Sequence, residues 1–115
     1  MNLTFIQTPM FIAQAARLKL TDEDVQALEK LIMDYPQRGD LMRGTGGIRK
    51  IRFAPPSWHV GKSGATRACY VLFSEAAACY FVSIFAKNDK ANLSAEDKTI
   101  LRKWVEATRR KMSGG

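Results

Sequence analysis

A run of cations without acids is the feature of this 115-residue chain with the clearest chemistry. No Asp or Glu occurs between Asp40 and Glu75, while that stretch contributes six positive charges to a formal net charge of +7. The six cations are Arg43, Arg49, Lys50, Arg52, Lys62 and Arg67. Such a block is either a solvated loop or a binding surface for a polyanion. Because strand-like apolar residues interleave with the cations of residues 48–53, we favour a phosphate-rich polyanion.

Conventional catalytic groups are scarce in this sequence. His59 is the only imidazole, and it lies in a loop punctuated by proline and glycine, where it is either an acid or base near neutral pH or a solvated or stacking side chain. Cys69 and Cys79 lack the spacing of a metal site or redox motif and lie in apolar segments. We expect them to be small buried hydrophobes and expect no metal or other cofactor.

Seven elements are predicted to position these residues. Strands are expected over residues 3–7, 48–53, 66–74 and 78–87, and helices begin after the caps Thr8, Thr21 and Ser94. The last helix runs to about Met112, with an apolar stripe that includes Ile100 and Val105. The order β-α-α-β-β-β-α indicates one α+β domain over residues 1–115. We expect an antiparallel sheet with the helices packed on one face.

Alternation along the strands predicts which side chains share a face of that sheet. Ile51 and Phe53 are expected to face the helices, with Lys50 and Arg52 on the opposite side. In the last strand, alternation separates Tyr80, Val82, Ile84 and Ala86 from Cys79, Phe81, Ser83, Phe85 and Lys87. If the strands pair in register, Arg67 and Lys87 join Lys50 and Arg52. The pattern predicts a basic, partly aromatic face held on rigid strands.

Two aromatic side chains accompany these cations. Phe85 lies two residues before Lys87, and Trp58 lies in the loop after the strand of residues 48–53. Each ring offers a surface on which a nucleic-acid base stacks. The alternatives are ordinary core packing for Phe85 and anchoring of the loop for Trp58.

Three blocks of the sequence resemble the HigB-like branch of the RelE/ParE toxin superfamily. The blocks are GTGGIRKIRF at 44–53, GKSGATR at 61–67, and FAKND at 85–89 followed by Leu93 and Ser94. The family pattern is roughly GTGGxRKxRxA, GKxGGxRxxY and YxKNExxxLS, so order and spacing agree, with Ala65 in place of one glycine. The resemblance implies the toxin of a type II toxin–antitoxin pair.

The resemblance also implies an activity and partners. Members of this branch enter the A site of the ribosome, on the 30S subunit, and cleave translated mRNA without a metal. A 2′-hydroxyl attacks the scissile phosphate, and translation and growth stop. The partners are a cognate antitoxin of the helix-turn-helix type, the ribosome and mRNA. No run approaches the ~20 apolar residues of a membrane span, so we expect a cytoplasmic protein.

Matched to the family pattern, individual residues acquire expected roles. The resemblance implies Lys50 as general base, Arg67 as the phosphate-stabilising arginine, and Lys87 as a charge stabiliser or proton donor to the leaving group. Arg49, Arg52 and Lys62 are expected to hold flanking phosphates. Two alternatives stay open: a ParE-like toxin that inhibits DNA gyrase by binding, and a non-catalytic RNA- or DNA-binding module. The presence of Lys50, Arg67 and Lys87 favours the nuclease.

Overall fold

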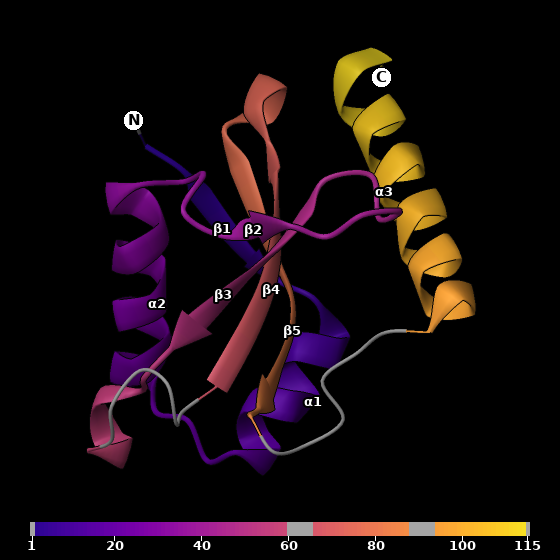
Figure 1. The fold of residues 1–115 in the computed structure, drawn as a ribbon. Helices are drawn as coiled ribbons and strands as arrows, with labels where there is room; N and C mark the ends of the chain where they lie inside the picture. The colour runs from indigo at the N-terminus through magenta and orange to yellow at the C-terminus, as the bar shows by residue number, and fades with distance from the viewer. Residues whose placement is uncertain (1, 60–65, 88–93, 115) are drawn as a thin grey trace.

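The computed structural model describes residues 2–59, 66–87 and 94–114, and within them the chain forms a five-stranded sheet with three α-helices (Figure 1). The elements are β1 (Thr4–Gln7), α1 (Pro9–Arg17), α2 (Asp22–Asp34), β2 (Asp40–Leu41), β3 (Ile48–Phe53), β4 (Thr66–Phe73), β5 (Ala78–Ala86) and α3 (Ala95–Gly114). Two short 3-10 helices, η1 (Pro56–Trp58) and η3 (Ser74–Ala76), follow β3 and β4. The α+β class predicted from the sequence is confirmed.

The sheet has the strand order β1-β5-β4-β3-β2. Its strands β2 to β5 pair antiparallel, including the predicted β4–β5 hairpin, but β1 pairs parallel with β5. The prediction of a wholly antiparallel sheet is therefore wrong at this edge, because a local residue pattern does not encode strand direction. The prediction also missed β2, whose two residues are too few to show any periodicity.

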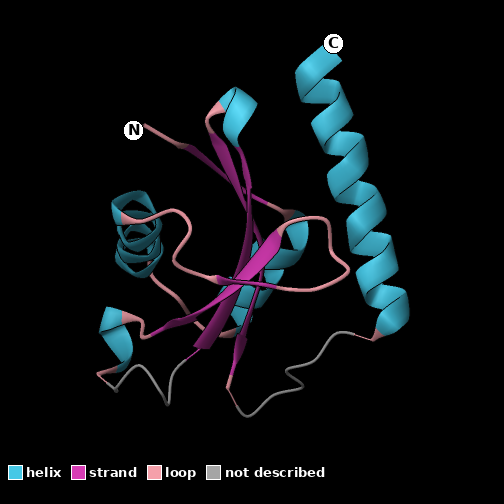
Figure 2. Ribbon diagram, turned by 45° about the horizontal axis from the view of Figure 1, so that its top comes forward, coloured by secondary structure: helices cyan, strands magenta, loops and turns pink. Residues whose placement is uncertain are grey.

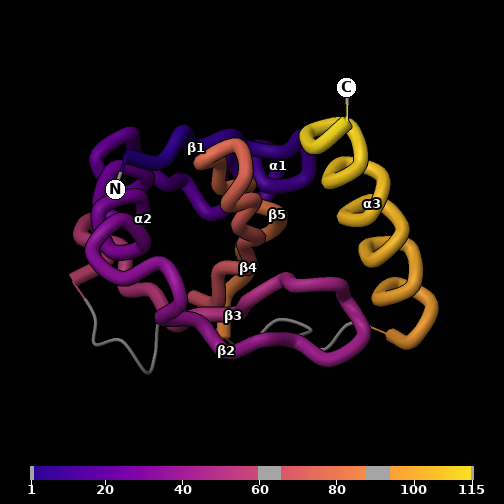
Figure 3. The backbone as a smooth tube through the Cα atoms, turned by 90° about the horizontal axis from the view of Figure 1, so that it is seen from above, coloured from indigo at the N-terminus to yellow at the C-terminus, as the bar shows by residue number. Residues whose placement is uncertain are grey.

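Helices cover both faces of the sheet rather than one. Side chains of α1 and α2 form one core cluster with the strands, and α3 contributes Val105 to a second cluster on the opposite face. Figures 2 and 3 show the sheet between α2 and α3. The expectation of helices on a single face is wrong, because the apolar stripe of α3 identifies an amphipathic helix without specifying which sheet face it covers.

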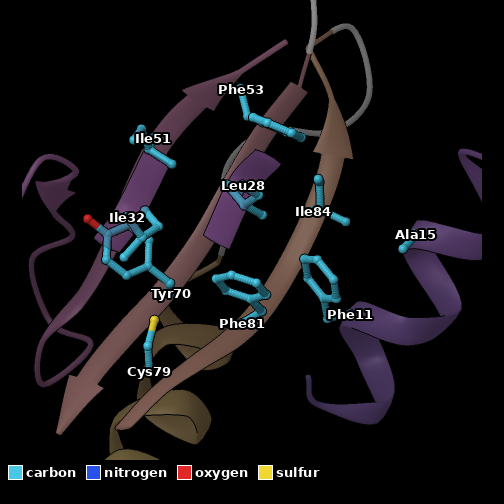
Figure 4. Close-up of a cluster of buried hydrophobic side chains, with 11 residues drawn as sticks. Phe11, Ala15, Leu28, Ile32, Ile51, Phe53, Tyr70, Cys79, Phe81 and Ile84 are labelled. Atoms are coloured by element: carbon cyan, nitrogen blue, oxygen red, sulfur yellow. The ribbon is translucent and has the colours of Figure 1, made fainter. Parts of the chain in front are cut away.

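The first core lies between the sheet and the helices α1 and α2 (Figure 4). The ring of Phe11 lies 5.1 Å from that of Phe81, centroid to centroid. The buried members are Phe11, Ala15, Leu28, Ile32, Ile51, Phe53, Ala68, Tyr70, Cys79, Phe81 and Ile84. Ile51 and Phe53 therefore face α1 and α2 as alternation predicts.

The second core lies beneath α3. Its buried members are Ile48, Cys69, Val71, Phe73, Val82 and Val105. Ile100 belongs to the predicted stripe of α3 but is 60% exposed. It lines an open apolar groove between α3 and the start of α1, together with Met10 and Leu101. The sequence prediction for this helix is thus correct for Val105 and wrong for Ile100.

Side-chain caps start the helices as predicted. The Thr8 hydroxyl accepts a hydrogen bond from the Phe11 amide, and Pro9 occupies the first turn of α1. Thr21 and Asp24 form a reciprocal capping box at the start of α2. No helix among the described residues has the length and apolar character needed to cross a membrane.

The strand β5 contains an irregularity that changes its faces. Tyr70 on β4 pairs with Phe81, and the preceding residue, Cys69, pairs with Ser83, so Val82 is left over as a bulge. Cys79, Phe81 and Ile84 contribute to the first core, whereas Tyr80, Val82 and Phe85 pack with the second. Simple alternation, which grouped Phe81 with Phe85 and Val82 with Ile84, is therefore wrong for this strand.

Candidate nucleic-acid interface

Three predicted site residues form a row across the middle of the sheet. Arg52 on β3 pairs with Arg67 on β4, and Arg67 pairs with Phe85 on β5. Lys50 lies two residues before Arg52 and therefore on the same face. We call these four residues, Lys50, Arg52, Arg67 and Phe85, the basic face. The structure brings them together as the sequence analysis predicted.

The basic face shares one side of the sheet with α3. The second core that α3 covers includes Ile48, Val71 and Phe73, which lie toward the β4–β5 turn. Arg52, Arg67 and Phe85 lie at the other end of the same strands. Arg52 is exposed, and Lys50, Arg67 and Phe85 are half-buried. α3 therefore packs over one end of this sheet face, and Arg52 at the other end is exposed.

The electrostatics of the basic face are unbalanced. Arg52 and Arg67 carry like charges on directly paired positions, an arrangement that destabilises a strand pair. Within residues 2–59, 66–87 and 94–114, the one salt bridge joins Arg102 to Glu106 on α3, at 3.6 Å. Within these same ranges, the Arg67 guanidinium donates to the neighbouring Thr66 carbonyl alone, at 3.2 Å. Two forked guanidiniums side by side are suited to bidentate contacts with phosphate.

Two further predicted site residues, Lys87 and Lys62, do not belong to this row. Lys87 follows β5 directly and is exposed, two residues beyond Phe85. Lys62 lies outside the described residues. Lys87 is thus close to Phe85 along the chain, and its part in the site stays a prediction.

Arg49 lies on the other face of β3. Its Nη1 atom donates to the carbonyl oxygens of Gly39, at 2.7 Å, and Gln37, at 3.1 Å. The guanidinium thus secures the segment between α2 and β2. The structure does not bring Arg49 together with the basic face, because alternate residues of a strand point to opposite sides.

Trp58 belongs to a segment tied to α2. The neighbouring Ser57 donates from its amide to Oδ1 of Asp24, at 3.0 Å, and from its hydroxyl to Oδ2, at 2.6 Å. Trp58 itself is half-buried at the end of η1, and His59 follows with an exposed side chain and a left-handed backbone, φ 54°. Ser57 thus anchors this segment, and the stacking role of Trp58 stays a prediction.

Asp24 is a buried carboxylate that holds two segments together. Burial acts to raise the pKa of Asp24, but hydrogen bonds from Ser57 and Thr21 outweigh it and keep the pKa below the ordinary value. The carboxylate therefore stays ionised at neutral pH. It joins the start of α2 to the loop after β3, an interaction that the sequence analysis missed because its partner is 33 residues away.

The two thiols are not nucleophiles. Burial raises the pKa of Cys79 to about 12, and burial likewise raises the pKa of Cys69. A protonated thiol is a poor nucleophile and a poor metal ligand. Both cysteines are free and buried, as the sequence analysis predicted.

The GTGG segment that begins the first sequence block has a structural role. Thr45 is fully buried, its hydroxyl donates to the Met42 carbonyl at 2.7 Å, and it accepts from the Ile48 amide at 3.1 Å. Gly46 and Gly47 adopt positive φ values of 80° and 128°, which glycine tolerates without strain. We call residues 44–47 the GTGG turn. It connects β2 to β3 and lies against α3, where Gly46 is near Val105.

Comparison with known proteins assigns the class and then the family. The sequence profile of the RelE toxin of RelE/RelB toxin–antitoxin systems matches residues 6–113. A double arginine-to-alanine mutant of E. coli toxin RelE in the free state superposes with a TM-score of 0.57 and 15% sequence identity, over 89% of this chain and 98% of that one. At this identity the structural likeness is one of fold. The protein is a toxin of the toxin–antitoxin class. Specifically, the chain belongs to the RelE toxin family.

Proposed function

We propose that this toxin is an endoribonuclease that cleaves translated mRNA in the ribosomal A site and thereby inhibits translation. The observation that supports this best is the row formed by Arg52, Arg67 and Phe85 on three adjacent strands. Neighbouring strands lie about 4.8 Å apart, so the row offers two phosphate contacts beside a stacking ring. Family membership supports the same activity.

In the proposed reaction, the uncharged amine of Lys50 accepts the proton of the 2′-hydroxyl next to the scissile phosphate. The 2′-oxygen attacks phosphorus, a new O–P bond forms, and the bond from phosphorus to the 5′-oxygen breaks. Lys87 donates a proton to that departing oxygen. Arg67 stabilises the negative charge that develops on the phosphoryl oxygens. The products are a cyclic 2′,3′-phosphate and a 5′-hydroxyl, and the balance requires no metal or other cofactor.

Dependence on the ribosome follows from the composition of the basic face. Its described members include neither a carboxylate nor an imidazole, the usual acid–base groups of a ribonuclease. The gain from holding a substrate in the reactive geometry is therefore especially important here. We propose that the 30S subunit supplies that orientation by fixing the mRNA at the A site.

Membership of the toxin family also supports an antitoxin partner. We propose a helix-turn-helix antitoxin whose acidic or amphipathic segment covers the basic face. Opposite charges would then accelerate the encounter of the two proteins. An antitoxin bound there would block the phosphate contacts of Arg52 and Arg67 directly.

The activity is tested with translating ribosomes. The purified protein is incubated with ribosomes on a defined message, and breaks are mapped by primer extension. We expect breaks within the A-site codon and 3′ fragments that begin with a 5′-hydroxyl. An intact message together with inhibited DNA gyrase would contradict the proposal and support the ParE-like alternative. An intact message bound to the protein would instead indicate a non-catalytic RNA-binding module.

A further inference from the structure

The bulge at Val82 determines which face of the sheet carries Phe85. Upstream of the bulge, Phe81 points into the first core, and strict alternation from there would send Ser83 and Phe85 to the same side. The leftover residue reverses the alternation, so that Ser83 pairs with Cys69 and Phe85 with Arg67. Phe85 therefore packs against the second core and lies beside Arg67. The aromatic part of the basic face exists because of this one extra residue.

Two side chains of the α1 segment hold the bulge. The Thr8 hydroxyl donates to the carbonyl oxygens of Phe81, at 3.0 Å, and Val82, at 2.9 Å. The Thr8 amide adds a hydrogen bond to the Phe81 carbonyl at 3.1 Å. Beyond the bulge, the Ile84 amide donates to Oε1 of Gln14 at 2.9 Å. We call this set of contacts from Thr8 and Gln14 the bulge clamp.

The bulge clamp satisfies backbone groups that the sheet leaves without a strand partner. The paired residues of β1 end at Gln7 opposite Phe81, so β5 continues past the end of its neighbour. Carbonyl and amide groups at this edge need other partners when they are buried. Val82 and Ile84 are both buried, and α1 supplies the missing donor and acceptor from its side chains. The geometry of β5 beyond Phe81 is therefore set by α1.

We propose that Thr8 and Gln14 are positioning residues of the RNA-cleaving face. They fix the bulge, and the bulge turns the Phe85 side chain toward Arg67. The bulge also directs the chain that leads from Phe85 to Lys87. This inference rests on the proposed endoribonuclease function. Neither residue lies on the basic face, so their effect on RNA passes through β5. A displacement of about 1 Å in a positioned group lowers a reaction rate by about 10²-fold.

The two functions of Thr8 are separable by substitution. Thr8→Asp keeps a helix cap, because a carboxylate accepts the Phe11 amide well. An ionised carboxylate has no proton for the carbonyls of Phe81 and Val82, so the same variant removes the two clamp contacts that the hydroxyl makes. Thr8→Ser keeps both functions. For the second contact, Gln14→Leu removes the acceptor for the Ile84 amide, and Gln14→Glu retains it.

Cleavage in translating ribosomes is measured for all four variants, with kcat and KM determined separately. We expect Thr8→Asp and Gln14→Leu to lower kcat by about 10²-fold, and Thr8→Ser and Gln14→Glu to stay near the wild-type rate. Thr21→Val is the matched control, because it removes the cap of α2 and costs stability far from β5. It should retain wild-type kcat once folded.

A direct readout of the bulge accompanies the kinetics. NMR should show that Thr8→Asp and Gln14→Leu accelerate hydrogen exchange of the Ile84 amide and weaken the contacts between the Phe85 ring and the second core. Wild-type kcat in Gln14→Leu with fast exchange at Ile84 would overturn the positioning role, and unchanged Phe85 contacts in both variants would overturn the clamp itself. If the wild-type protein cleaves no message, the proposed function fails, and the NMR arm alone decides whether the clamp orients Phe85.

Discussion

Arg52 and Arg67 occupy paired positions on β3 and β4, where two like charges oppose each other. Like charges on directly opposite positions destabilise a pair of strands. A phosphate bound between the two guanidiniums would make their electrostatic energy favourable, since each guanidinium would then have an anionic neighbour. In the proposed complex, the repulsion in the free protein would thus become part of the attraction for RNA. Residues chosen only for stability would not be arranged in this way.

At the same scale, removal of single cations tests the proposed chemistry. We expect Arg67→Ala and Lys87→Ala each to slow mRNA cleavage by about 10²-fold or more, the usual effect of losing one charge-stabilising donor. Thermal unfolding should change little, because Lys87 is exposed and Arg67, in the part of the chain that the structure describes, donates to its neighbour's carbonyl alone. Arg110→Ala, an exposed cation on α3, is the control and should cleave normally. Normal cleavage in both test variants would exclude these residues from the site.

Asp24 links the fold to pH. Its pKa is lower in the folded chain than its ordinary value, so the ionised carboxylate stabilises the fold at neutral pH. This contribution is lost as the pH falls below about 4, the ordinary value for Asp, and through the lower folded value. We expect Asp24→Asn to reduce the free energy of unfolding at pH 7 by about 2 kcal/mol, as for hydrogen bonds to a charged group.

Urea unfolding at a series of pH values checks this expectation. The wild-type protein should lose stability toward acid more steeply than Asp24→Asn does. The control is Asp22→Asn, an exposed position in the same first turn of α2. A pH profile of Asp24→Asn that parallels the wild type would show that another carboxylate is responsible.

At the scale of elements, the sequence predicts those features of helices and strands that depend on residues close by in the chain. Thr8 and Thr21 predict where two helices begin, because a capping side chain bonds to an amide only three residues away. Lys50 and Arg52 are correctly predicted to share a face, because β3 is a regular strand. The faces of β5 are not predictable in this way, since the bulge at Val82 depends on Thr8, 74 residues away. Arg49 has the residue type of a phosphate ligand, but its partners at Gln37 and Gly39 are set by tertiary structure.

The GTGG turn provides the element-scale test. We expect Gly46→Ala to lower the free energy of unfolding by roughly 1–3 kcal/mol, because a side chain at φ 80° is strained. The added Cβ would also meet Val105 at 3.5 Å, an ordinary contact, so strain rather than collision dominates. Gly114→Ala, at an open position near the end of α3, is the control and should be nearly neutral. Equal stability of the two variants in urea would contradict this account.

At the scale of the whole molecule, the second sheet face is divided between two tasks. Its end near the β4–β5 turn is covered by α3, and its other end carries the basic face. With a formal net charge of +7, the chain as a whole also attracts polyanions at long range. The local row of cations and the global charge therefore favour the same ligand, and both effects weaken as salt is added.

The salt dependence of RNA binding measures how many phosphates are held. Contacts from the charged side chains of Arg52, Arg67 and Lys87 predict a slope of about −2 for log K against log salt on single-stranded RNA, from about 0.7 per phosphate. Arg52→Ala should reduce the slope by about 0.7. Phe85→Leu should weaken binding at every salt concentration and leave the slope unchanged, because stacking releases no counterions. Fluorescence anisotropy with a short labelled RNA gives both quantities, and a flat response would point to a different surface.

The buried hydroxyl of Thr45 has a consequence for how related genes are interpreted. The GTGG turn shapes the connection from β2 to β3 and the seat of α3, whereas the proposed chemistry depends on side chains at positions 50, 52, 67, 85 and 87. A homologue that retains the turn but substitutes those positions would be expected to keep this scaffold and lack nuclease activity. When genomes are surveyed, we therefore expect the glycine-rich motif to identify the architecture, and we expect the five side-chain positions to indicate whether a homologue has the proposed nuclease activity.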